Sequence, residues 1–378
     1  MPEYAMDPDD TGAAESAYAV VIPTLGRPSL NATLRAVADA EGPKPERVVL
    51  VDDRPGTDGT TPLPVEIPAA LRPLTAVVRG EARGPAAARN TGWRAAGRVP
   101  WIVFLDDDVV PGPTWCDDLA LDLAAATAED GTTSTVGTAG TMGAVTARID
   151  VPLPVGRRPT DWERNTAGLA TARWITADMA YRREALETVG GFDERFRRAF
   201  REDADLALRA LAAGWSVTAG TRTTVHPVRQ ADRWISVRLQ RGNADDVLMT
   251  RLHGRDWWTR AAAPRGRLPR HLAVTAAAAA ALACAALRKP AAATVCATAW
   301  LAGTAEFALA RILPGPRDRE EVLTMAATSV LIPPAAVWHW LRGQITHRTA
   351  APLDPYEGTP GHPPGMPQRA LRDERIRR

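Results

Sequence analysis

Three consecutive aspartates end an apolar segment near the middle of the chain. Residues 101–105 have the length and composition of a strand buried on both faces, and Asp106, Asp107 and Asp108 follow directly. We expect these acids at the carboxyl end of the strand, the edge where open α/β sheets bind ligands. Asp106 and Asp108 point the same way along an extended chain, so they can share a divalent cation, Mg²⁺ or Mn²⁺. An ordinary acidic turn after a core strand is the alternative interpretation.

A second acidic pair, Glu202 and Asp203, opens a predicted helix that ends before Gly214. The helix dipole favours negative charge in the first turn and helps to keep a carboxylate ionised. Ordinary helix-start acids remain the alternative interpretation. His226 follows the next predicted strand, and it is either a third metal ligand or a structural histidine.

The predicted strands and helices that must position these residues alternate along the chain, which is typical of a mainly parallel sheet flanked by helices. Right-handed crossovers would bring the strand ends Thr24, Asp52–Asp53 and Asp106–Asp108 to one edge of the sheet. Strands are predicted at residues 18–22, 47–51, 74–78 and 101–105, with helices at 30–40 and from Gly84 onward.

The segment after the aspartates has a weaker pattern. Residues 136–149 are predicted to form one or two strands, and residues 157–166 a loop that could order over a ligand. A strand at 174–181 and a short helix at 183–189 follow, and Gly190–Gly191 closes that helix. Residues 229–251 form a basic, predominantly helical stretch.

Three apolar, alanine-rich segments follow a basic linker at 260–270, at residues 271–287, 291–313 and 322–341. Pro333–Pro334 interrupts the last one. A helical hairpin in or on a bilayer and an Ala-rich soluble appendage both fit these segments. The flanking residues favour an anionic membrane surface. These residues are Arg265, Arg267, Arg270, Arg288, Lys289, Trp338 and Trp340.

Composition and charge narrow the class of protein. The chain has 378 residues, is 45% hydrophobic and carries a formal net charge of +2, which gives no indication of nucleic-acid binding. Its three cysteines, Cys116, Cys284 and Cys296, are far apart and predict no disulfide framework. The start of the chain lacks the pattern of a secretory signal, so we expect a cytoplasmic location.

Six segments, taken in order, resemble the family 2 glycosyltransferases of the GT-A fold. The resemblance covers roughly residues 18 to 250. The segments are 21–27 (VIPTLGR), 49–53 (VLVDD), 84–92 (GPAAARNTG), 104–108 (FLDDD), 183–194 (REALETVGGFDE) and the Glu202–Asp203 pair. The implied fold is a mixed, mainly parallel α/β sheet flanked by helices, here followed by the Ala-rich helical appendage. The predicted division is a disordered tail at 1–17, the GT-A domain at 18–258, the membrane-associated helical region at 259–348 and a disordered tail at 349–378.

The resemblance implies transfer of a sugar from a nucleotide-diphosphate donor to an acceptor hydroxyl by direct displacement with inversion, assisted by Mg²⁺ or Mn²⁺. The acceptor would be a glycan, a lipid-linked molecule or another hydroxyl compound. Asp203 would be the general base, beside Glu202 in the same motif. Asp106, Asp108 and His226 would hold the metal. The residues facing the nucleotide sugar would be Thr24, Arg27, Asp52, Asp53, Arg89, Asp106 and Asp107.

Residues 230–234 match the QxxRW motif of processive members, but they follow the acidic pair closely. We therefore interpret them as an amphipathic helix packed near the acceptor site. Trp174, Trp234 and Arg238 are candidates for holding the acceptor. The location implied is the inner face of the cell membrane. A sugar nucleotidyltransferase and a non-catalytic nucleotide-sugar-binding membrane protein remain the alternative functions.

Overall fold

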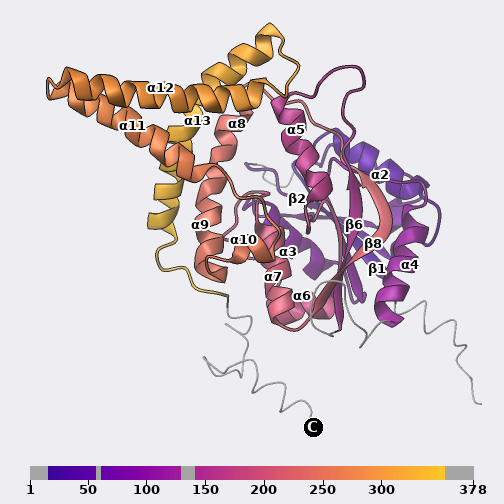
Figure 1. Cartoon of the computed structure of the whole chain (residues 1–378). Coiled ribbons are helices and arrows are strands. Elements are labelled where there is room, and N and C mark those ends of the chain that lie inside the picture. The colour runs from indigo at the N-terminus through magenta and orange to yellow at the C-terminus, as the bar shows by residue number, and fades with distance from the viewer. Residues whose placement is uncertain (1–15, 57–60, 129–140, 354–378) are drawn as a thin grey trace, which may run out of the picture. The chain divides into compact units, whose positions relative to one another are not determined.

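The computed structural model describes residues 16–56, 61–128 and 141–353 (Figure 1). The predicted disordered tails lie almost wholly outside these residues, as does the start of the strand region predicted from residue 136. The described chain forms two compact units. The first holds the chain up to Asp150 together with Trp174–His226, and the second holds Val151–Arg173 and Pro227–Pro352.

One mixed sheet of eight strands forms the core of the first unit. Its order is β3-β2-β1-β4-β7-β6-β8-β5. Strands β3, β2, β1 and β4 run parallel, β7 is antiparallel to both β4 and β6, β6 is parallel to β8, and β5 is antiparallel to β8. The predicted fold class, a mixed and mainly parallel α/β sheet, is therefore confirmed. The strands are β1 (Tyr18–Thr24), β2 (Arg47–Asp52), β3 (Thr75–Arg79), β4 (Trp101–Leu105), β5 (Val110–Pro111), β6 (Met142–Asp150), β7 (Asp178–Arg182) and β8 (Ser216–Val225).

The central strands β1 and β4 are buried on both faces, which their apolar sequences permit. All five residues of β4 are fully buried, and Val20, Val21 and Ile22 of β1 are equally inaccessible. Thr24 is in register with Asp52 on the neighbouring parallel strand. The polar residues that end β1, β2 and β4 therefore share one edge, as the sequence predicts.

Helices of the first unit lie against this sheet (Figure 1). Helix α3 (Pro85–Ala95) begins at the predicted Gly84–Pro85 pair, where Gly84 has a positive φ of 97°. It packs so closely that a Cβ on Gly92 would come within 2.2 Å of Val21 Cγ1 and 2.9 Å of Val51 Cγ2. The other helices are α2 (Ser29–Asp39), η1 (Arg72–Leu74), α4 (Trp115–Ala128), α6 (Arg183–Val189) and α7 (Glu202–Ala212).

The loop predicted at residues 157–166 is wrong in its second half. Residues Asp161–Ala167 form helix α5, and its start is a complete capping box. The Thr160 side chain accepts a hydrogen bond from the Glu163 amide, while the Glu163 carboxylate accepts one from the Thr160 amide. These two reciprocal bonds satisfy backbone donors that a loop would leave to water.

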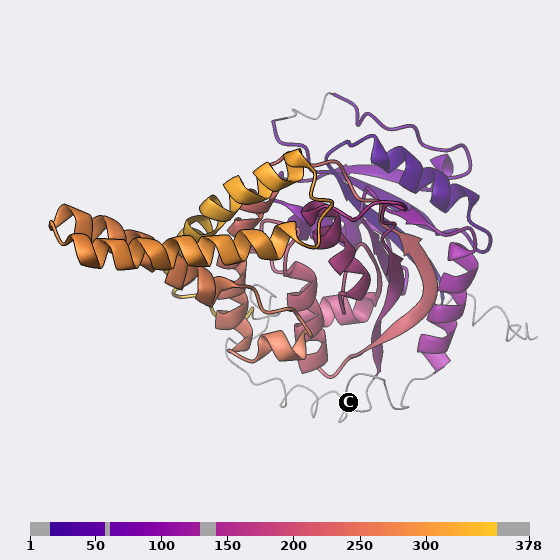
Figure 2. The same cartoon turned by 45° about the horizontal axis from the view of Figure 1, so that its top comes forward.

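The second unit consists of helices. Three of them, α11, α12 and α13, are long and apolar enough to cross a membrane by length and composition. Helices α11 and α12 lie side by side as a hairpin in both views (Figures 1 and 2). The helices of this unit are α5, η2 (Gly168–Thr171), α8 (Ile235–Arg238), η3 (Leu239–Arg241), α9 (Gly242–His253), α10 (Trp257–Arg260), α11 (Leu268–Ala286), α12 (Pro290–Ile312) and α13 (Arg319–Thr346).

One prediction about the C-terminal part differs from the structure. Helix α13 continues through Pro333–Pro334, which we expected to interrupt it. Packing explains this continuity, because Ile332, Pro333 and Ala336 are buried. The second compact unit resumes at Pro227, and the predicted domain division at residue 258 stays a prediction. Helix α9 packs on α13, where a Cβ on Gly343 would come within 2.8 Å of Ala244 Cα.

Candidate active site

The edge formed by β1 and β4 places a threonine and an arginine on the middle aspartate of the acidic run. Thr24 Oγ1 donates a hydrogen bond to Asp107 Oδ2 at 2.7 Å, and Arg27 Nη1 lies 2.8 Å from Asp107 Oδ1. The Thr24 hydroxyl also accepts from the Gly26 amide at 2.9 Å. Asp107 is buried, while the Arg27 side chain is 40% exposed. The structure thus joins these three predicted residues, with the arginine open to solvent.

The two aspartates that end β2 have different environments. Asp52 forms a two-pronged ion pair with Arg54, at 2.8 and 2.7 Å, and this bonding lowers the pKa of Asp52. Asp53 accepts a hydrogen bond from the Gly84 amide at 3.1 Å, and burial raises its pKa. Asp53 therefore holds the start of α3 against the sheet edge, whereas Asp52 anchors the loop that leaves β2.

A buried arginine connects the two acidic segments. Arg89 of α3 is 2% exposed, and its guanidinium extends to the end of β4 and the start of α7. Arg89 Nη2 lies 2.7 Å from Asp106 Oδ1, and Arg89 Nη1 lies 2.9 Å from Glu202 Oε1. One guanidinium thus holds carboxylates that are 96 residues apart in the sequence (202 − 106).

Helix α7 presents the second acidic pair at its N-terminus. Glu202 is buried, and desolvation together with the neighbouring Asp203 raises its pKa to about 8, while Arg89 acts in the opposite direction. Asp203 is half-buried, and its Oδ1 accepts a hydrogen bond from the Ala204 amide at 2.7 Å. Desolvation also raises the pKa of Asp203, and the charges of Arg89 and Arg201 oppose that shift. Arg201 precedes the helix at a positive φ of 77°, a strained conformation for this residue.

Asp106, Asp108 and His226 form a candidate metal site. One ligand atom from each side chain lies within 4.8 Å of the other two. His226 Nε2 is 3.9 Å from Asp108 Oδ1, and the His226 amide donates to Asp150 O at 2.7 Å, which fixes the residue just after β8. Two carboxylates and one imidazole suit Mn²⁺ or Mg²⁺. The donor set therefore fits the cation predicted from the sequence.

A buried charge network behind this edge was not predicted. Arg222 of β8 is inaccessible to solvent and lies 2.9 Å from both Asp178 Oδ1 and Asp122 Oδ2. Asp178 also accepts hydrogen bonds from Trp115 Nε1 and Thr224 Oγ1, each at 2.6 Å. These contacts tie β7, β8 and α4 together next to the strand end that carries His226. In a chain with many arginines, nothing in the local sequence distinguishes Arg222.

Asn90 is a second residue with an unpredicted role. Its side-chain amide donates to Phe192 O, and its carbonyl oxygen accepts from the Phe192 amide, each at 2.9 Å. Trp93 Nε1 donates to the same Asn90 oxygen at 3.0 Å. These bonds fasten α3 to the turn that precedes α7. The sequence contained a clue, because Asn90 lies in the Ala-Arg-Asn segment used for the family resemblance.

The three acceptor candidates are not brought together within one unit. Trp174 belongs to the first unit and is 5% exposed, whereas Trp234 and Arg238 belong to the second. Trp234 is 42% exposed, and Arg238 pairs with Asp232. Their role in acceptor binding stays a prediction. The helix expected at 230–234 is wrong, because α8 begins only at Ile235 and Asp232 Oδ1 accepts from the Trp234 amide at 2.8 Å.

Comparison with protein families gives one match, which covers residues 19–190 and is described as glycosyl transferase family 2. This span contains four of the predicted segments in full and most of the fifth, 183–194. The resemblance predicted from the sequence is therefore confirmed over these residues. A search of curated proteins found no match.

Solved structures that match this chain include three with bound nucleotides or nucleotide sugars. GalNAc-T7 with UDP, GalNAc and Mn²⁺ is 16% identical, with a TM-score of 0.43; the match covers 67% of this chain and 52% of that one. The mannosyltransferase PcManGT from Pyrobaculum calidifontis with GDP-Man and Mn²⁺ is 19% identical, with a TM-score of 0.45 and 86% of both chains covered. S. aureus TarS 1-349 with UDP-GlcNAc is 15% identical, with a TM-score of 0.38. The match covers 88% of this chain and 91% of that one. The chain thus spans about half the length of the first of these proteins.

Proposed function

Residues 19–190 match glycosyl transferase family 2, and from this match we propose a reaction for the site at the sheet edge. The chain transfers a sugar from a nucleotide-diphosphate donor to an acceptor hydroxyl, with metal assistance and inversion at the anomeric carbon. The observation that carries the proposal is the Arg89 guanidinium, 2.7 Å from Asp106 and 2.9 Å from Glu202. It holds the proposed donor side and the proposed base side of the site together.

The ends of β1, β2 and β4 supply the donor-binding residues. We assign the nucleotide sugar to the edge lined by Thr24, Arg27, Asp52–Asp53 and Asp106–Asp107. Arg27 suits the diphosphate because its guanidinium is partly exposed and carries a fork of N–H donors. Arg89 stays buried and acts on the donor by holding Asp106 in place.

Asp106, Asp108 and His226 would hold Mg²⁺ or Mn²⁺. A divalent cation there supplies positive charge that offsets the charge developing on the diphosphate leaving group. The three side chains come from two distant segments, and the His226 amide donates to Asp150 O at the end of β6, which fixes His226 just after β8. One ligand atom of each side chain thus lies within 4.8 Å of the other two, as a shared cation would need.

Asp203 is the proposed general base. It lies in the first turn of α7, half-buried, next to Glu202, which the Arg89 guanidinium holds. A carboxylate in this place can accept the proton of the attacking hydroxyl. Attack by that hydroxyl on the face opposite the leaving diphosphate gives inversion in a single displacement. Glu202 would hold the Glu202–Asp203 segment in its orientation through its contact with Arg89.

Two other functions are less well supported. A sugar nucleotidyltransferase would need a glycine-rich, basic loop after the first strand to hold a triphosphate. Here that loop runs from Leu25 to Pro28 and contains one glycine, Gly26. A non-catalytic binding protein would not need Asp203 poised at a helix N-terminus, and this residue together with the metal-type cluster favours the enzyme.

We also place the protein at the inner face of the cell membrane. The most apolar 18-residue stretches of α11 and α12 have mean hydropathies of 1.4 and 1.3, and only 6% of each stretch is buried. Such surfaces are unfavourable in water and favourable against lipid. The acceptor would then be lipid-linked, or a glycan or other hydroxyl compound delivered at that surface.

A two-part measurement tests the proposed reaction. A thermal-shift screen of nucleotide sugars with and without Mn²⁺ should identify one donor with a metal-dependent stabilisation. Incubation with that donor should release a nucleoside diphosphate in step with product formation. Release of pyrophosphate from a nucleoside triphosphate plus a sugar phosphate would instead establish the nucleotidyltransferase, and donor binding without turnover would establish the binding protein.

A further inference from the structure

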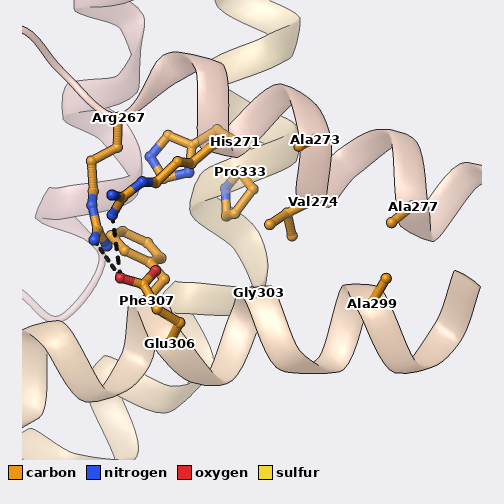
Figure 3. Close-up of a pocket in the computed structure, with 11 residues that line it drawn as sticks. Arg267, His271, Ala273, Val274, Ala277, Ala299, Gly303, Glu306, Phe307 and Pro333 are labelled. Carbon is orange, nitrogen blue, oxygen red and sulfur yellow. Dashed lines mark hydrogen bonds and ion pairs between the residues drawn. The ribbon is translucent and has the colours of Figure 1, made fainter.

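A pocket of about 420 Å³ lies between α11 and α12, with Pro333 of α13 beside it (Figure 3). Most of the side chains that line the part of the pocket between the two helices are small and apolar. A Cβ on Gly303 would come within 2.6 Å of Val274 Cγ2, so the two helices approach closely at this point. Three alanines, Ala273, Ala277 and Ala299, also line this wall. Such a wall offers no hydrogen-bonding side chain and suits a hydrocarbon chain.

One end of the pocket is cationic. Arg267 Nη2 and Arg270 Nη1 approach the same oxygen, Glu306 Oε1, at 2.6 and 3.3 Å. Two guanidiniums therefore share a single carboxylate, which leaves an excess of one positive charge. The side chains of Arg267, Arg270 and Glu306 are 31%, 67% and 52% exposed, so all three reach solvent and can rearrange. The His271 and Phe307 rings, 4.9 Å apart, close the space beside them (Figure 3).

We propose that this pocket binds the phosphate headgroup of an anionic membrane lipid, with the first part of the lipid chain along the alanine wall. Arg267 and Arg270 would share the phosphate oxygens, because guanidinium forks match phosphate geometry. The exposed Glu306 would turn toward solvent as the anion enters. This inference concerns the second unit alone and does not rest on the proposed transfer reaction.

The chemistry favours a lipid over a free phosphate ester. A water-soluble ester would use the arginines but leave the apolar wall exposed to water. Helices α11 and α12 already present apolar surfaces of the kind that lie against lipid, including Leu282 and Leu301, which are 74% and 57% exposed. A lipid that binds along these helices would bury its hydrocarbon chain against the apolar wall and place its phosphate at the two arginines at the same time.

The first test compares two pairs of charge-removing variants of the full chain. Binding is measured by flotation with vesicles of phosphatidylcholine alone or mixed with phosphatidic acid. Arg267→Gln with Arg270→Gln should lose at least about tenfold more affinity for the phosphatidic acid vesicles than Arg265→Gln with Arg288→Gln. The control pair removes the same charge from exposed residues outside the pocket. Equal losses in the two pairs would overturn the proposal, because general surface attraction would then explain the binding.

A second pair of variants keeps every charge. Ala277→Phe fills the pocket, whereas Ala276→Phe adds the same ring at an exposed neighbouring position outside it. The first should abolish the preference for phosphatidic acid while binding to phosphatidylcholine persists, and the second should keep the preference. Glycerol 3-phosphate, the headgroup without chains, should fail to compete. Full competition by it, or an unchanged preference in Ala277→Phe, would contradict a lipid site.

Discussion

Arg89 is the residue on which the candidate site depends most. It is buried between Asp106 and Glu202, and no single shorter side chain can make both of its contacts. Removing one partner of a buried ion pair leaves the other charges uncompensated, which typically costs about 3–5 kcal/mol. The arginine therefore supports both the stability of the fold and the alignment of the two acidic segments.

The first prediction is that Arg89→Lys sharply reduces both stability and activity. Lysine keeps the charge but offers one ammonium instead of a two-armed fork. We expect a loss of about 3 kcal/mol in the free energy of unfolding by urea and a fall in kcat of about a hundredfold. Arg94→Lys is the matched control, because Arg94 lies exposed on the same helix. Wild-type turnover in Arg89→Lys would show that the bridge has no part in the reaction.

The second prediction concerns pH. Asp203 must be deprotonated to act as a base, and desolvation raises its pKa above the ordinary value of 3.8. Activity should therefore be present above the raised pKa and fall as the pH drops through it. A profile of kcat/KM against pH should show its acidic limb above the range of an exposed aspartate. A limb at or below pH 3.8 would exclude Asp203 as the titrating base.

At the scale of elements, the contact of α3 with β1 and β2 sets the position of Arg89. Gly92 permits this contact, because a Cβ there would come within 2.2 Å of Val21 Cγ1. The third prediction is that Gly92→Ala destabilises the protein by about 1–3 kcal/mol through overpacking. Gly168→Ala is the control, since a Cβ at Gly168 meets nothing within 4 Å. Equal melting temperatures for the two variants would mean that α3 can shift freely on the sheet.

The elements that the sequence predicts well are those in which a local pattern and the tertiary environment agree. Apolar runs located β1, β2 and β4, of which β2 and β4 end at aspartates, and the Gly84–Pro85 pair located the start of α3. The edge shared by Thr24 and Asp106 followed from parallel pairing. Helix α5 was missed, although Thr160 and Glu163 have the spacing of a capping box, because its polar composition was taken to indicate a loop.

Residues whose role depends on distant partners could not be predicted in the same way. The contacts of Arg222 with Asp122 and Asp178 span 100 and 44 positions of the sequence. No local periodicity encodes such a contact. The bridge from Arg89 to Glu202 was likewise invisible, although both residues were singled out separately. The continuity of α13 through Pro333–Pro334 also depends on packing against other helices, which overrides the local effect of proline.

At the scale of the whole molecule, the exposed apolar helices are the feature that bears on location. The fourth prediction is that the full chain binds phosphatidylcholine vesicles through α11 and α12. Leu282→Ser with Leu301→Ser should weaken flotation by about tenfold or more, because each leucine would lose burial in lipid. Leu121→Ser is the control, since Leu121 is 65% exposed on α4 of the other unit. Full binding by the double variant would exclude these helices as the membrane contact.

The most direct test is a comparison of Asp108→Asn with Asp203→Asn, using the donor found in the screen, with Mn²⁺ present. Donor affinity is measured by titration calorimetry and turnover by product formation. We predict that Asp108→Asn loses the metal-dependent part of donor binding. Asp203→Asn should bind donor as the wild type does, but turn over about 10²–10⁴-fold more slowly. Retained turnover in Asp203→Asn, or unchanged metal-dependent binding in Asp108→Asn, would contradict a single site in which one acidic segment holds the donor and the other activates the acceptor.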